Sequence, residues 1–137
     1  MLEANFPALK DNFLITSPID ARYNCIAWAY GENSVWFWPD RWCYWPVNIP
    51  REETVEAFVS LFSSINYRLC DDSSLEVGYE KIAIYMQGDA PTHAAKQLSS
   101  GKWSSKLGES IDIQHDTPED LNGPLYGEAT VYMKRKV

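Results

Sequence analysis

The stretch EKIAIYM, residues 80–86, decides the fold class, because the hydrophobic period changes here. Its residues alternate between two faces, and this two-residue period is typical of a β-strand. The faces carry Ile82, Ile84 and Met86 on one side and Lys81, Ala83 and Tyr85 on the other. The second half of the chain therefore begins a β-sheet.

Further strands are predicted downstream of this one. THAAKQL (92–98) and KWSSKLG (102–108) flank the glycine-containing loop SSG, which predicts a β-hairpin. SIDIQ (110–114) and EATVYMKRK (128–136) are expected to add strands, and TPEDL (117–121) predicts a short helical turn between them. The sequence thus indicates an antiparallel sheet of four or five strands.

Two helices are predicted before the sheet. In NIPREETVEAFVSLFSSI (48–65) the apolar residues repeat at helical spacing, and Pro50 suits the first turn. CIAWAYG (25–31) predicts a helix of about two turns, with Asn24 as N-cap and Gly31 as C-cap. Residues 1–20 are expected to be an extended lead-in. The order of helices followed by strands predicts one α+β domain over residues 1–137.

Composition limits the classes of function. The net charge of −7 comes without an acidic tail or a block of like charges, and the one basic cluster, KRK at 134–136, is interpreted as an edge or solubility feature, so we expect no nucleic-acid partner. No apolar run approaches the ~20 residues of a membrane span, and the first residues do not resemble a signal peptide. We therefore expect a cytoplasmic protein without a membrane partner, and the oligomeric state stays open.

The three cysteines are Cys25, Cys43 and Cys70, an odd number with wide spacing that fits neither a disulfide framework nor a zinc ribbon. Reduced thiols are the simplest prediction, with a Cys43–Cys70 bridge as the alternative if the protein is exported. A zinc site from Cys25, His93, His115 and an acid would use suitable ligand types, but no C-x-x-C or H-x-x-x-H pair supports it. We expect no metal and no cofactor.

Cys25 is the candidate nucleophile. It begins a predicted helix, where free N–H groups and the helix dipole lower a thiol pKa. The chain offers two histidines as its base, His93 and His115. His93 is preferred because it opens a strand beside Ala94 and Ala95, and we expect its face of the strand to lie over the packed helix.

The segments YNCIAWA and THAAKQLSSGKWSSKLG, in this order, resemble papain-like thiol hydrolases, particularly NlpC-type and CHAP-type amidases, and are similar to an uncharacterised bacterial family with that arrangement. The resemblance implies a papain-like fold, a peptide or amide substrate, Cys25 as nucleophile and His93 as proton carrier. It also implies a third residue that orients the imidazole. His115 is favoured over the other candidates, which are Ser104, Ser105, Lys106 and Asp112.

The same resemblance implies oxyanion donors at the Cys25 N–H and Asn24. From the aromatic content of the chain, Trp28 and Trp38 are the expected substrate-binding residues. The chain departs from NlpC-type enzymes next to the cysteine, where Asn24 and Ile26 replace the usual aspartate and serine. The tryptophan-rich segment VWFWPDRWCYWP (35–46) is then either core filling or one wall of a substrate cleft.

Other interpretations stay open. Cys25 alone would be interpreted as core packing, His93 as a structural histidine and His115 as a solvated loop residue. The alternative function is a non-catalytic binding or immunity-type module with an aromatic surface.

Overall fold

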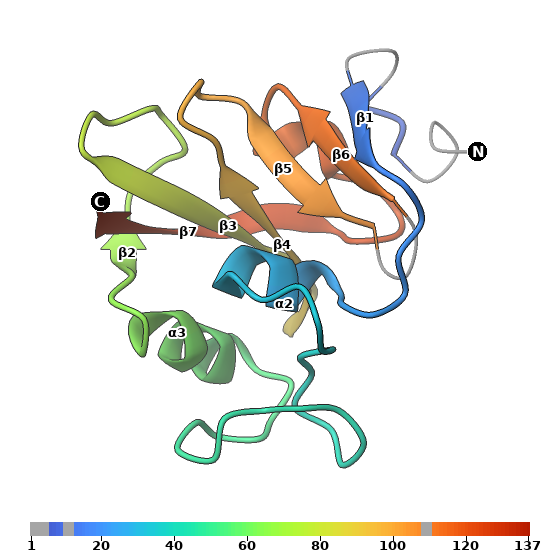
Figure 1. The fold of residues 1–137 in the computed structure, drawn as a ribbon. Helices are drawn as coiled ribbons and strands as arrows, with labels where there is room; N and C mark the ends of the chain where they lie inside the picture. The colour runs from blue at the N-terminus through green and yellow to red at the C-terminus, as the bar shows by residue number, and fades with distance from the viewer. Residues whose placement is uncertain (1–5, 10–12, 108–110) are drawn as a thin grey trace.

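The computed structural model describes residues 6–9, 13–107 and 111–137, and these form an α+β fold around one antiparallel sheet (Figure 1). The seven strands of the described chain lie in the order β1-β6-β5-β4-β3-β7-β2. Their bounds are β1 Phe13–Ser17, β2 Arg68–Cys70, β3 Tyr79–Gln87, β4 Ala90–Gln97, β5 Trp103–Lys106, β6 Asp112–His115 and β7 Glu128–Lys136. All neighbouring strands pair antiparallel.

The five predicted strands correspond to β3–β7, so the antiparallel sheet and the α+β class are confirmed. Gly108 and Ser110, at the ends of two predicted strands, lie outside the described residues. The predicted number of strands was too small, because β1 and β2 add one strand at each edge. Part of the expected lead-in is therefore sheet. β1 exposes Leu14 and Ile15, and it has no alternating pattern because it buries little of either face.

Helix α2 spans Cys25–Tyr30 as predicted. The Asn24 side chain accepts the N–H of Ala27 at 3.2 Å, and Gly31 ends the helix at φ 107°, a conformation that glycine adopts without strain. Helix α3 spans Val55–Ser63, so the prediction of a first turn at Pro50 was wrong. Thr54 caps the helix instead, accepting the N–H of Ala57 at 3.2 Å.

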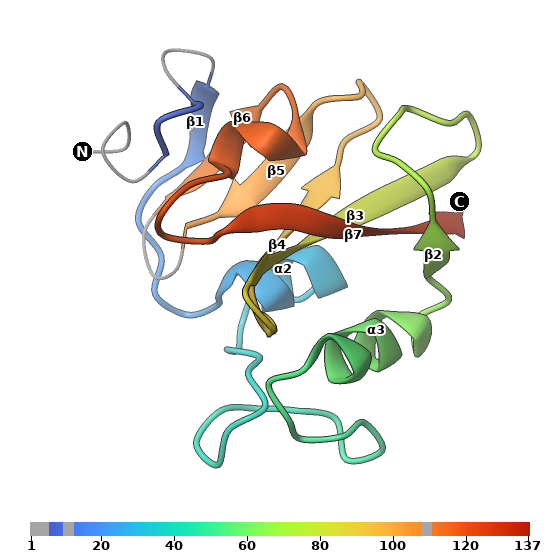
Figure 2. The same ribbon diagram turned by 180° about the vertical axis from the view of Figure 1, so that it is seen from behind.

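The predicted turn at 117–121 is confirmed as the short 3-10 helix η1, Pro118–Leu121. It lies on the opposite side of the sheet from α2 (Figure 2). None of the helices in the described residues has the length and apolar character needed to cross a membrane.

Two cores lie on the two faces of the sheet. Residues of α2 and α3 pack with Ile82, Ile84 and Ala94, which face one side. On the other side, Tyr85 and Trp103 pack with Leu121 of η1. Side chains that alternate along β3 and β4 therefore enter different cores, so a residue of β4 and its neighbour face different surroundings.

Candidate active site

Cys25 lines a pocket of about 310 Å³ beside the start of α2. We call it the aromatic pocket. It is lined by Asn24, Cys25, Trp36, Trp38, Asp40, Cys43, Thr92 and Tyr126. The Trp-rich segment thus contributes a wall to the pocket that contains the predicted nucleophile. Only 6% of Cys25 is exposed, so access to the sulfur is narrow.

The predicted low pKa of Cys25 is not what its surroundings produce. Burial raises the pKa of the thiol to about 11, and N–H groups of Ala94, Ile26 and Cys25 itself oppose that rise in part. Loss of hydration destabilises the buried thiolate more than the N–H groups at the start of this six-residue helix stabilise it. Cys25 is therefore a protonated thiol at neutral pH.

His93 belongs to a buried chain of hydrogen bonds that crosses three strands. Its Nε2 lies 3.0 Å from Ser105 Oγ, and Ser105 Oγ lies 2.8 Å from His115 Nε2. The Nδ1 of His115 lies 2.8 Å from the carbonyl oxygen of Thr117. Both imidazoles are fully buried, as is Ser105. We call these three side chains the histidine relay.

Burial lowers the pKa of both histidines, and the charge of His115 lowers that of His93 further. Both rings are therefore neutral near pH 7. The Thr117 carbonyl only accepts, so His115 Nδ1 carries the proton and its Nε2 accepts the Ser105 hydroxyl. Ser105 Oγ then accepts from His93 Nε2, which leaves His93 Nδ1 as a bare acceptor. This Nδ1 is buried and has no hydrogen-bond partner among the described residues.

Cys25 and His93 are not hydrogen-bonded to each other: among the described residues His93 Nε2 pairs with Ser105 Oγ, and His93 Nδ1 has no partner. Cys25 belongs to the helix-side core with Ala94, whereas the His93 ring packs on Tyr85 of the other core. The prediction that the His93 face lies over the helix was wrong, because Ala94 faces α2.

Tyr126 connects the two sides. Its ring stacks on His93 with 4.1 Å between centroids and 8° between planes, and it also lines the aromatic pocket beside Cys25. Burial raises the pKa of the Tyr126 phenol, so it stays protonated. The sequence offered no signal for Tyr126, which lies in the loop before β7.

The remaining predicted residues have different positions. Asn24 lines the pocket, but its side chain is engaged at both ends, by the carbonyl and N–H of Phe37 and the N–H of Ala27. Trp28 does not line the pocket, since its Nε1 donates to Ser104 Oγ at 3.0 Å and Lys96 lies over its ring. Trp38 does line the pocket.

His115 is not the solvated loop residue of the alternative interpretation, because it is buried in β6. It does not touch His93 directly, since Ser105 lies between them. Asp112, another candidate third residue, accepts the Tyr23 hydroxyl at 2.9 Å instead. His93 Nε2 is thus hydrogen-bonded to Ser105 directly and to His115 only through Ser105.

All three cysteines are free thiols, so the alternative Cys43–Cys70 bridge is absent. Cys43 shares the aromatic pocket with Cys25. Across residues 6–9, 13–107 and 111–137, no group of three or more histidine, cysteine or acidic side chains is arranged to hold a metal ion.

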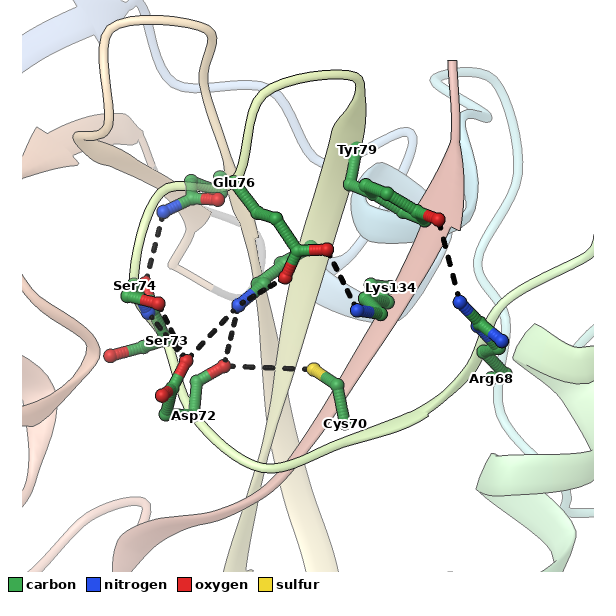
Figure 3. Close-up of polar contacts among 10 residues, drawn as sticks. Arg68, Cys70, Asp72, Ser73, Ser74, Glu76, Tyr79 and Lys134 are labelled. Carbon is green, nitrogen blue, oxygen red and sulfur yellow. Dashed lines mark hydrogen bonds and ion pairs between the residues drawn. The ribbon is translucent and has the colours of Figure 1, made fainter.

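A second polar pocket, of about 360 Å³, lies between β2 and the loop before β3. The buried Lys81 ammonium donates to the Asp72 carbonyl at 3.1 Å and to its carboxylate at 3.2 Å. The Glu76 carboxylate accepts a hydrogen bond from Lys134 at 2.8 Å (Figure 3) and also lies 3.8 Å from the Lys81 ammonium. These acids and bases are paired with one another, so the cluster holds the loop on the sheet.

The fold and the pocket together define an α+β protein with a buried thiol in an aromatic pocket and a histidine relay that is linked to this pocket through Tyr126. The chain belongs to the family described as Domain of unknown function (DUF7689), whose profile matches residues 14–134. Comparisons with curated proteins and with solved structures find no significant match.

Proposed function

We propose that this protein is a papain-like thiol hydrolase or acyltransferase that acts on an amide or peptide bond. Cys25 is the nucleophile and His93 the general base. The observation that carries the proposal is the order of donors and acceptors in the histidine relay, which leaves the Nδ1 of His93 unprotonated and without a partner in the described part of the chain. A buried acceptor without a hydrogen-bond partner lowers the stability of the fold, so its presence is explained if this nitrogen takes a proton during catalysis.

In the proposed reaction a neutral thiol and a neutral imidazole react together. The Cys25 sulfur bonds to the carbonyl carbon while its proton passes to His93 Nδ1. The amide C–N bond then breaks, and His93 returns the proton to the leaving nitrogen. Water, or another amine in a transferase, attacks the thioester, again through His93, and restores the Cys25 thiol.

The environment of the sulfur supports this sequence. The N–H groups of Ala94, Ile26 and Cys25 surround the sulfur and stabilise negative charge near it. Asn24 acts by capping α2 and holding Phe37, so backbone groups serve as the oxyanion donors. Tyr126 stacks on His93 and lines the pocket of Cys25, so the proposal requires this ring to be displaced when substrate binds; catalytic hydrogen bonds often form only in the substrate complex.

A second candidate is a binding pocket without covalent chemistry. It is favoured by the 6% exposure of Cys25 and by the burial that raises the pKa of its thiol to about 11. In that case the aromatic pocket would hold a ligand, and Cys25 would be part of its wall.

Acetylation by 4-nitrophenyl acetate separates the two candidates. We expect acetyl transfer to Cys25, read by peptide mass spectrometry, and loss of at least about a hundredfold in rate in His93→Gln. Cys25→Ser removes the thiol that accepts the acetyl group, so acetylation at this position should be lost. Cys43→Ser is the matched control, because Cys43 lines the same pocket, and it should change the Cys25 rate by less than about twofold.

The pH dependence gives a second readout that needs no variant. With imidazole as base, the rate should level off above about pH 6.5, since the pKa of His93 lies below its ordinary value. An unassisted thiol would instead react tenfold faster with each pH unit up to about 11. That continuous rise, or an unchanged rate in folded His93→Gln, would contradict the hydrolase proposal and favour the binding pocket.

A further inference from the structure

The aromatic pocket contains one charged side chain, Asp40, among the residues that line it. Its Oδ1 accepts the N–H groups of Trp42 at 2.9 Å and Cys43 at 2.8 Å. These two bonds fix the carboxylate within the Trp-rich segment. Its Oδ2 lies 3.8 Å from the Cys43 sulfur, the longest of these contacts.

Asp40 is an ionised carboxylate. The N–H of Cys43, followed by that of Trp42, lowers the pKa of Asp40 below its ordinary value. Within the described part of the chain, no basic side chain forms an ion pair with it. The charge of nearby Arg51 also lowers the pKa of Asp40, but the hydrogen bonds of its guanidinium go to the carbonyl oxygens of Asp40, Cys43 and Trp45. The carboxylate thus gives the pocket a negative charge.

Three aromatic side chains line the same pocket as this charge. Trp36 is held by its Nε1, which donates to the Ala21 carbonyl at 2.6 Å. Trp38 packs edge-on against Phe58, with 5.4 Å between ring centroids. Tyr126 is held by its stack on His93. The faces of fixed aromatic rings attract cations, and a neighbouring carboxylate adds to that attraction.

We propose that the aromatic pocket binds a cationic side chain of the substrate, of the lysine or arginine type, with its charged end at Asp40 and its methylenes along the aromatic rings. A volume of about 310 Å³ is at the small end for ligand sites, which suits one side chain. This inference rests on the proposed function, because it places the bond to be cleaved beside Cys25.

Three methanethiosulfonates test the charge preference. They carry an aminoethyl cation, a neutral methyl group or a sulfonatoethyl anion. In each case the Cys25 sulfur forms a disulfide with the reagent's alkylthio sulfur, methanesulfinate leaves, and the thiol proton passes to His93 or water. The whole folded protein is labelled and then digested, and peptide mass spectrometry gives the rate of modification at Cys25. The rate at Cys70, which lies outside the pocket, is an internal reference.

Asp40→Asn is the informative variant, because the amide oxygen keeps the role of Oδ1 as acceptor for both N–H groups. Asp116→Asn is the matched control. It gives the same net charge but changes an exposed acid that pairs with Lys102. We expect the cation-to-anion rate ratio at Cys25 to fall about tenfold in Asp40→Asn and to stay within about twofold of the original in Asp116→Asn.

The outcomes separate the two proposals. An equal ratio in both variants, with Cys25 still reacting with the neutral reagent, overturns the cationic substrate and leaves the thiol hydrolase intact. If the folded protein protects Cys25 from all three reagents, the nucleophile itself is lost and the proposed function fails. A fall confined to Asp40→Asn supports the cation site.

Discussion

Tyr126 stacks on His93 with 4.1 Å between ring centroids, and the same ring is part of the wall of the pocket that contains Cys25. One aromatic side chain therefore separates the candidate base from the candidate nucleophile and shields both from water. The consequences of this arrangement can be measured at each of its parts.

Replacing Tyr126 tests whether this side chain keeps water away from His93. Tyr126→Leu should lower the free energy of unfolding by about 2 kcal/mol, from lost ring stacking and lost volume. It should also admit water, so that the pKa of His93 rises toward its ordinary value. Tyr126→Phe keeps the stack and should change neither quantity much. NMR titration of His93 gives the pKa, and an unchanged titration in Tyr126→Leu would show that Tyr126 does not cause the burial.

The proton positions in the histidine relay are a direct prediction. His93 should be the Nε2–H tautomer and His115 the Nδ1–H tautomer, because the Thr117 carbonyl accepts at one end of the chain. Long-range proton–nitrogen NMR at pH 7.5 distinguishes the two tautomers. Finding the Nδ1–H tautomer at His93 would remove its role as base in the resting protein.

Neighbouring serines provide a matched pair of variants. Ser105→Ala leaves a buried nitrogen unpaired on each of two histidines and should cost about 2–4 kcal/mol of unfolding free energy. Ser104→Ala loses the bond from Trp28 and should cost about 1 kcal/mol. Denaturant unfolding measures both. Acetylation of Cys25 should slow in Ser105→Ala alone, and equal slowing in both variants would show a general structural effect.

Stability should depend on pH through the buried histidines. Their folded-state pKa values lie below the unfolded value of about 6.5, so the unfolded state binds more protons below that pH. Stability is thus full above about pH 6.5 and falls toward the folded pKa values, by at most about 1.4 kcal/mol per pH unit for each histidine.

Denaturant unfolding between pH 5 and 8 checks this dependence. The carboxylates contribute at lower pH, because hydrogen bonds from Arg22 and Ser74 hold the pKa of Asp20 and Asp72 at about 2 and that stability is lost only below about 4. His115→Gln should flatten the slope between pH 5 and 6.5. A slope that is unchanged in this variant would assign the pH dependence to other groups.

Much of the fold could be predicted from short-range patterns. The alternation in residues 80–86 identified β3, and Asn24 and Gly31 marked both ends of α2, because caps and periodicity act within one segment. The start of α3 was misplaced because Thr54, as well as Pro50 with the acids after it, can begin a helix. The edge strand β1 escaped because its pairing with β6 is made by backbone groups that carry no sequence pattern.

The sequence by itself determined the α+β class, the strands β3–β7, helix α2 and three candidate site residues: the helix-start Cys25 and the two histidines, His93 and His115. Only the tertiary structure decided that Cys25 is buried, that Ala94 and not His93 faces the helix, that Ser105 joins His93 to His115, and that Asp40 and Tyr126 line the pocket of Cys25. The physical reason is the separation along the chain of the residues that interact. Periodicity and capping depend on neighbours in the chain, whereas desolvation, ring stacking and a hydrogen-bond chain across three strands depend on residues that the sheet brings together from distant positions.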